Sequence, residues 1–106
     1  MMRVFYIFLI IFSISFSSFG MSGIGFFKRQ GCGVCHKETI NTIGPSVKEI
    51  SEAYKGNKQA LKEYLQGKRK PIVEPKKSSL MERFIRKTKN FSEKELNAIV
   101  EYLTSF

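Results

Sequence analysis

Histidine and cysteine are scarce in this chain of 106 residues, which contains one histidine and two cysteines. A structural zinc site needs four ligands, usually supplied as two separated pairs. Here all three side chains fall within the five residues from Cys32 to His36, and no second Cys or His pair exists elsewhere in the sequence. A four-ligand zinc site is therefore disfavoured.

Acidic residues are also few, and aspartate is absent. Nine glutamates stand against 18 lysines and arginines, which gives a formal net charge of +9 at pH 7. Such a charge favours anionic partners, although scattered lysines also fit a simple solvated surface. We expect partners with acidic faces, namely redox proteins if the chain carries electrons, and an anionic membrane surface as a second class. Nucleic acid is not expected, because the N-terminal segment indicates export.

The sequence lacks an apolar run of the about 20 residues that a membrane-spanning helix needs. Residues 1–20 contain one positive charge, then an apolar core, then small residues that include Ser18 and Gly20. This profile is typical of a secretory signal peptide cleaved ahead of Met21. We expect a periplasmic protein whose single domain spans residues 21–106. The alternative is an uncleaved N-terminal anchor at the outer face of the inner membrane.

No stretch alternates between apolar and polar residues for long enough to predict a strand. Apolar residues recur instead at helical spacing, in short segments that begin at Ser or Asn and end at Gly. The sequence therefore predicts an all-α fold of four to five short helices. They are expected over residues 23–30, from Ser46 to Gly56, from Asn57 to Gly67, as a short turn from Ser79, and from Ser92 to Leu103.

Three of these segments carry the capping-box pattern, in which a serine is followed three residues later by a glutamate. The pairs are Ser46 with Glu49, Ser79 with Glu82 and Ser92 with Glu95. Between the third helix and the turn at Ser79, residues 68–78 show no periodicity, so we expect a long polar loop there.

The motif Cys32-Gly33-Val34-Cys35-His36 carries the chemistry of the chain. The spacing C-x-x-C-H is the attachment signal for c-type haem. Two thiols three residues apart on one turn can add to the two vinyl groups of haem, and the adjacent imidazole reaches the iron. We expect one covalent haem c on Cys32 and Cys35, with His36 as an axial ligand.

Two further readings of the motif stay open. A thioredoxin-like C-x-x-C belongs at a helix start after a strand in a βαβ unit, and no such strand is predicted. A Cys32–Cys35 disulfide suits an exported protein but closes a very small loop, which brings little stability. Both are weaker than the haem interpretation.

Around the motif, the sequence resembles class I c-type cytochromes, the single-haem electron carriers whose iron is ligated by His and Met. Phe27 to Cys32 resembles the first helix of the family, and Ser92 to Leu103 its closing helix. Gly44-Pro45 resembles the Gly-Pro pair that follows the haem motif. The resemblance implies the cytochrome c fold around one covalently bound haem, a Pro45 carbonyl that orients His36, and Gly23 at a close crossing of the first and last helices.

The resemblance also implies a methionine as the sixth iron ligand. Met81 lies in the expected interval and has Phe84 three residues later, but Glu82 stands where the family commonly has proline. Methionine is also a common core residue. We expect His36 and Met81 to be the axial ligands. If Met81 does not ligate, the open iron position predicts a gas-binding or peroxidatic haem protein.

The expected function is therefore electron transfer by a monomer that is not an enzyme and that shuttles single electrons between periplasmic or membrane redox partners. The alternative is a permanent haem subunit of a larger dehydrogenase. Tyr54, Tyr64, Arg69 and Lys70 are candidates for contact with the haem propionates, with solvent exposure the simpler expectation for each. The side chains expected to bury the macrocycle, each with core packing as the ordinary alternative, are Phe27, Ile40, Ile43, Val47, Leu61, Leu65, Ile72 and Phe84.

Overall fold

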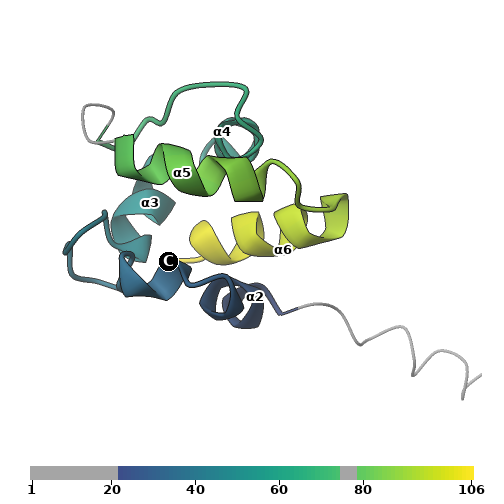
Figure 1. The fold of residues 1–106 in the computed structure, drawn as a ribbon. Coiled ribbons are helices and arrows are strands. Elements are labelled where there is room, and N and C mark those ends of the chain that lie inside the picture. The colour runs from purple at the N-terminus through teal and green to yellow at the C-terminus, as the bar shows by residue number, and fades with distance from the viewer. Residues whose placement is uncertain (1–21, 75–78) are drawn as a thin grey trace, which may run out of the picture.

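The computed structural model describes residues 22–74 and 79–106, which fold into helices joined by short connections (Figure 1). In these ranges there is no strand, and the one β-type contact is an isolated bridge between His36 and Asn41. The all-α prediction is confirmed, whereas the segment 1–20 predicted as a signal peptide lies outside the described residues. The elements are α2 (Gly23–Arg29), the 3-10 turn η2 (Cys32–Val34), α3 (Val47–Tyr54), α4 (Lys58–Leu65), α5 (Ser79–Thr88) and α6 (Glu93–Leu103). None of the described helices is both long and apolar enough to span a bilayer.

The first and last helices cross at Gly23. A Cβ atom on Gly23 would lie 2.2 Å from the carbonyl oxygen of Ala98 and 2.9 Å from the Cβ of Tyr102, so the backbones meet too closely for any side chain. One turn later, the rings of Phe27 and Tyr102 pack with centroids 5.0 Å apart. This crossing fixes α2, and with it the start of η2, against α6.

Serine or asparagine caps begin α2, α3, α4 and α6, and of the capping boxes predicted at Ser46 and Ser92 only the one at Ser92 forms. At Ser92 both halves are present, since its hydroxyl accepts from the Glu95 amide and its own amide donates to the Glu95 carboxylate. At Ser46 the hydroxyl accepts from the Glu49 amide, while the Ser46 amide donates to Asn41 Oδ1 at 2.8 Å. The predicted box at Ser46 is therefore wrong, because a side chain from the preceding loop takes the place of Glu49.

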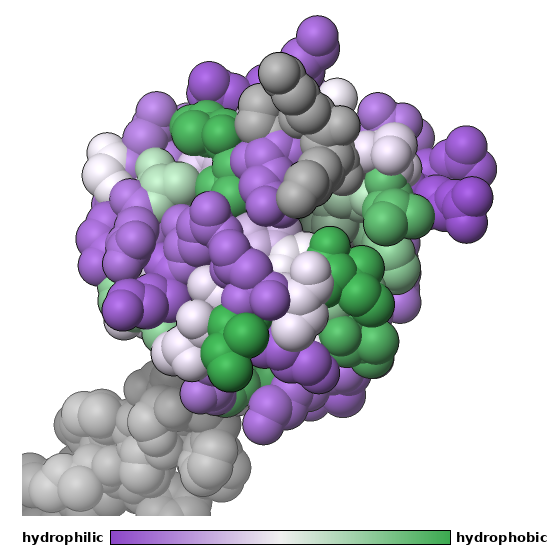
Figure 2. Space-filling view, turned by 90° about the vertical axis from the view of Figure 1, so that its left-hand side faces the viewer, coloured by the Kyte–Doolittle hydropathy of each residue, from purple (hydrophilic) through white to green (hydrophobic). Residues whose placement is uncertain are grey.

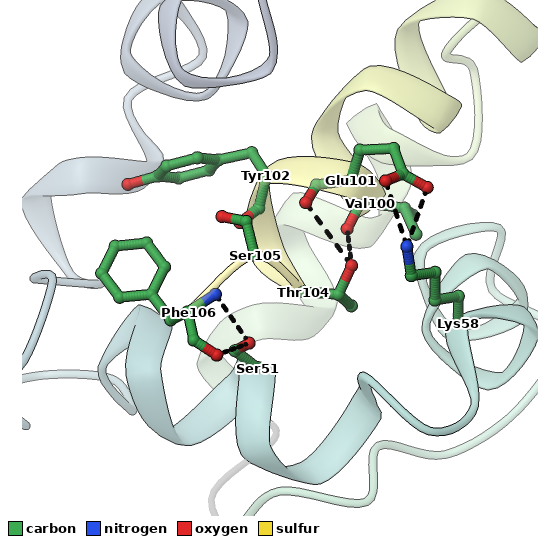
Figure 3. Close-up of polar contacts among 8 residues, drawn as sticks. All are labelled: Ser51, Lys58, Val100, Glu101, Tyr102, Thr104, Ser105 and Phe106. Carbon is green, nitrogen blue, oxygen red and sulfur yellow. Dashed lines mark hydrogen bonds and ion pairs between the residues drawn. The ribbon is translucent and has the colours of Figure 1, made fainter.

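The core lies where α6 meets the other helices. Helix α6 contributes Leu96, Ile99, Val100 and Leu103, all of them buried. After α6, the chain turns onto α3, where the Ser51 hydroxyl donates to the Phe106 carbonyl at 2.9 Å and accepts from the Phe106 amide at 3.0 Å (Figure 3). The other helices bury Phe26, Phe27, Val47, Ile50, Tyr54, Ala60, Leu61 and Leu65.

Helix α5 differs from the expectation for its segment. The sequence predicts only a short turn after Ser79, whereas the structure has a helix of ten residues, Ser79–Thr88. Only Thr88 of this helix is buried, and Leu80 and Phe84 are exposed. In Figure 1, α5 lies on the opposite side of α6 from α2. Residues of α5 also line a cavity of the fold.

Candidate functional site

The C-x-x-C-H motif folds as a tight turn directly after α2. Gly31 has φ +80°, a left-handed conformation that favours glycine, and it turns the chain into η2. The His36 amide donates to the Cys32 carbonyl at 3.0 Å, which closes the turn. Both cysteines are free thiols of intermediate burial, and both line the same cavity as His36.

The imidazole of His36 is oriented by the backbone of Pro45. Nδ1 of His36 lies 2.7 Å from the Pro45 carbonyl oxygen. Because a carbonyl oxygen can only accept, Nδ1 carries the proton and donates it. The neutral ring then has its lone pair on Nε2, the atom that is free to bind a metal.

Gly44 lets the loop approach the imidazole this closely. A Cβ atom on Gly44 would lie 2.7 Å from Cε1 and 2.9 Å from Nδ1 of His36. The Gly44 amide also donates to the Cys35 carbonyl at 3.0 Å, and the Thr42 hydroxyl donates to the same oxygen. The loop after the motif is therefore folded back onto it and holds the ring from one side.

An apolar cavity opens in front of the two thiols and the imidazole, with walls from α3, α4, α5 and α6. This arrangement fits haem, because two thiols, an imidazole with a free Nε2 and a thioether face one mainly apolar space. Its lining includes Phe27, Ile43, Ile50, Leu61, Leu65, Val73, Leu80, Met81, Phe84, Phe91, Ile99 and Leu103.

Met81 reaches this cavity from α5, in the first half of the helix. It is partly buried, packs against the hydrophobic core and lines the cavity together with His36. Figure 1 shows α5 and residues 32–36 on different sides of the fold. A thioether and an imidazole from segments far apart in the sequence therefore face one space.

The apolar side chains predicted to surround the macrocycle divide into two groups. Five of the eight line the cavity: Phe27, Ile43, Leu61, Leu65 and Phe84. The other three do not. Val47 is fully buried in the core, whereas Ile40 and Ile72 are exposed at the surface. Val47 thus follows the alternative of core packing, and for Ile40 and Ile72 the prediction is wrong, because sequence position alone does not tell which apolar side chain faces a cavity.

Two tyrosines, Tyr54 and Tyr64, are among the residues that line the cavity. Tyr54 is 2% exposed, and its hydroxyl oxygen accepts from the Ile72 amide at 2.8 Å, so the expected solvent exposure of Tyr54 is wrong. Burial, with smaller contributions from Tyr54 and Glu82, raises the pKa of Tyr64 to about 12. Arg69 and Lys70 are exposed, as expected.

Lys87 and Thr88 also line the cavity, and reasoning from the sequence missed both. Burial raises the pKa of the Cys32 thiol, and the ammonium of Lys87 opposes that rise, so this charge lies near Cys32. The signal for Thr88 was present. Met81, Phe84, Ile85 and Thr88 recur at steps of three, one and three, which continues one helical face.

Comparisons with known proteins agree with this geometry. The model of the family described as cytochrome c matches residues 21–106, most of the chain. The chain is also similar to cytochrome c2 of Rubrivivax gelatinosus, with 50% identity over 28 residues, which are 26% of this chain and 33% of that protein. The match thus spans about a third of the length of this curated relative.

Proposed function

We propose that this chain, which belongs to the cytochrome c family, is an electron carrier that shuttles single electrons between redox proteins and is not an enzyme. Members of this family bind haem covalently. Membership supports a haem protein that transfers electrons. The observation that carries the proposal is the convergence of Cys32, Cys35 and His36 on one apolar cavity.

The residues that would hold the haem follow from this geometry. Cys32 and Cys35 would form the two thioether bonds, and His36 would ligate the iron through Nε2. Met81 would supply the sixth ligand from α5. When bound, haem provides an iron that gains or loses one electron, and Met ligation raises its reduction potential.

The surrounding side chains set the conditions for that exchange. The hydrogen bond from Nδ1 of His36 to Pro45 fixes the ring and increases the basicity of Nε2. The apolar lining keeps water away and lowers the local dielectric, which disfavours the additional positive charge of the ferric state. A fixed ring and a dry cavity both reduce the rearrangement that accompanies a change of charge.

The surface charge supports acidic-faced redox proteins as partners. Apart from Lys62, every lysine and arginine in residues 22–74 and 79–106 is exposed. Figure 2 shows hydrophobic groups among mainly hydrophilic side chains on one face of the molecule. Within the described ranges, ion pairs neutralise only part of the charge: Lys58 with Glu101, Lys62 with Glu93 and Arg69 with Glu63. The remaining cations are available to steer an anionic partner.

We include the localisation of the protein in the same proposal. Residues 1–20 would direct the chain to the periplasm, or alternatively anchor it at the outer face of the inner membrane, where an anionic lipid surface is a second partner. The carrier would act as a monomer. Co-purification with a dehydrogenase at high salt would favour a permanent haem subunit instead, because a steered encounter complex separates under those conditions.

Steering is tested with two small oxidants of opposite charge, hexacyanoferrate(III) and tris(phenanthroline)cobalt(III). Oxidation of the reduced protein by the anionic complex should slow as ionic strength rises, and oxidation by the cationic complex should become faster, because salt screens attraction and repulsion alike. Rates that do not depend on salt for either oxidant would overturn the steering proposal while leaving electron transfer intact.

A further inference from the structure

Helix α5 is tied to α4 through one buried hydroxyl. The side chain of Thr88, the last residue of α5, is 4% exposed. Its hydroxyl donates to the Leu65 carbonyl at 2.5 Å and lies 3.3 Å from the Ile85 carbonyl in its own helix. The bond to Leu65 joins residues that are 23 positions apart, at the end of α4 and the end of α5.

None of the three backbone amides that follow α4 donates to the Leu65 carbonyl. The last carbonyls of an α-helix lack intrahelical donors. The amides of Gln66, Gly67 and Lys68, which follow α4, donate to carbonyls that precede Leu65. Since a buried acceptor left without a donor is costly, the Thr88 hydroxyl is the group that satisfies this end of α4.

A second contact supports the same end of α5. Gly67, with φ +76°, would carry a Cβ only 3.4 Å from Cγ2 of Ile85, so Ile85 rests against the turn that ends α4. At the other end of α5, Leu80 is 57% exposed and Met81 packs against the core. A hydrogen bond to another helix thus holds α5 at its last turn.

Met81 lies seven residues before Thr88, about two helical turns or about 10 Å along the axis, and on the same face. An α-helix of this length is rigid. The contact of Thr88 at the last turn therefore determines where the first turn lies over the cavity. A small rotation about the Thr88 end would move Met81 away from the cavity.

We propose that Thr88 is a positioning residue for Met81: its bond to the Leu65 carbonyl holds α5 in the orientation that keeps the Met81 thioether in the cavity. The inference rests on the proposed function, in which Met81 is an axial ligand. It predicts that loss of the Thr88 hydroxyl increases the fraction of molecules in which the sixth position is open.

The chain offers a matched control in Thr104. This threonine, which directly follows α6, is also buried, but its hydroxyl donates to carbonyls of the adjacent α6, to Val100 at 2.8 Å and to Glu101 at 3.4 Å (Figure 3). Thr104→Val therefore removes a buried hydroxyl without removing a bond between helices. Thr88→Ser keeps the hydroxyl, and Ile85→Ala weakens the second contact between α4 and α5.

The experiment measures imidazole binding to the ferric holoprotein, together with the weak long-wavelength absorption band of methionine-ligated ferric haem. Apparent affinity scales with the fraction of open molecules. Loss of one buried bond predicts imidazole binding about tenfold tighter in Thr88→Val. A smaller shift in the same direction is expected for Ile85→Ala, which also provides the test if Thr88→Val does not accumulate. Thr88→Ser and Thr104→Val should stay within about twofold of the parent protein.

Two different results would contradict the inference and are easy to distinguish. If the parent protein shows the methionine band and Thr88→Val binds imidazole no better than Thr104→Val does, Thr88 does not position Met81, and the proposed ligation stands. If the parent protein itself lacks the band, Met81 is not a ligand, and both proposals fail at that point.

Discussion

The Nδ1 atom of His36 and the carbonyl oxygen of Pro45 lie 2.7 Å apart, nine residues from each other along the chain. The loop between them folds back so that Gly44 lies against the ring. The bond assigns the ring proton to Nδ1 and leaves the lone pair on Nε2, the atom that would ligate iron under the proposed function. Local backbone geometry thus orients the imidazole as that role requires.

Replacement of Gly44 tests that contact. In Gly44→Ala the new Cβ would lie 2.7 Å from Cε1 of His36, so the ring or the loop must shift. Overpacking of this kind destabilises by about 1–3 kcal/mol. Thermal unfolding of the holoprotein should show this loss. Gly56→Ala is the control, because nothing lies within 4 Å of its Cβ position, and equal stability of the two variants would contradict the account.

Loss of Met81 should open the iron. Met81→Ala removes the thioether that lines the cavity, so the reduced protein is expected to bind carbon monoxide and its reduction potential to fall. Ile40→Ala, a change at an exposed apolar residue that does not line the cavity, should leave both properties unchanged. Carbon monoxide binding by the unaltered protein would show that Met81 does not ligate and would favour the gas-binding or peroxidatic alternative.

The raised pKa of Tyr64 predicts a specific dependence of the free energy of unfolding on pH. Its pKa is raised to about 12 in the folded protein, mainly by burial, against about 10 in the unfolded chain. Between these values the unfolded state loses its proton first, so the free energy of unfolding falls as pH rises from about 10 to about 12. In Tyr64→Phe this part of the decline should disappear, as denaturant titrations at several pH values would show. Parallel pH profiles for the two proteins would argue against it.

Lys87 should affect docking more than a cation away from the cavity does. It lines the cavity and lies near Cys32, whereas Lys58 is paired with Glu101 and does not line it. Lys87→Gln is expected to slow oxidation by hexacyanoferrate(III) at low salt by about twofold. Lys58→Gln removes the same charge and should have a smaller effect. Equal slowing would mean that net charge, and not its position, controls the rate.

Much of the fold follows from local signals in the sequence. Helix α6 combines a serine cap, a capping box and apolar residues at helical spacing, and the structure confirms it. The predicted capping box at Ser46 fails because Asn41, a residue of the preceding loop, reaches the Ser46 amide. A contact of that kind depends on the fold of the loop and has no signature at fixed spacing.

The length of helix α5 differs from the prediction for a related reason. Its large apolar residues Leu80, Met81, Phe84 and Ile85 fall within six positions, so the segment predicts a short turn, although the same helical face continues to Thr88. Tyr54 was expected to be exposed, yet its hydroxyl is buried by the loop that carries Ile72. Both errors concern side chains around the cavity, where position depends on segments distant in the sequence.

The sequence predicts the candidate site because the residues of the C-x-x-C-H motif lie within five positions. Two cysteines and the histidine lie on one turn, so spacing alone indicates that they act together. The assignment of Met81 depended on the family resemblance, since no local pattern distinguishes a ligand from a core methionine. Thr88 continues the helical face of Met81 in the sequence, but its bond to the Leu65 carbonyl, which ties α5 to α4, could be recognised only from the structure.

The most direct test of covalent haem attachment is mass spectrometry of a tryptic peptide. Arg29 and Lys37 flank the motif, so digestion releases residues 30–37 as one peptide. The account predicts that this peptide carries one haem bonded to both Cys32 and Cys35, with no unmodified form in the coloured protein. The same peptide recovered without haem, with free thiols or a disulfide, would contradict the central claim.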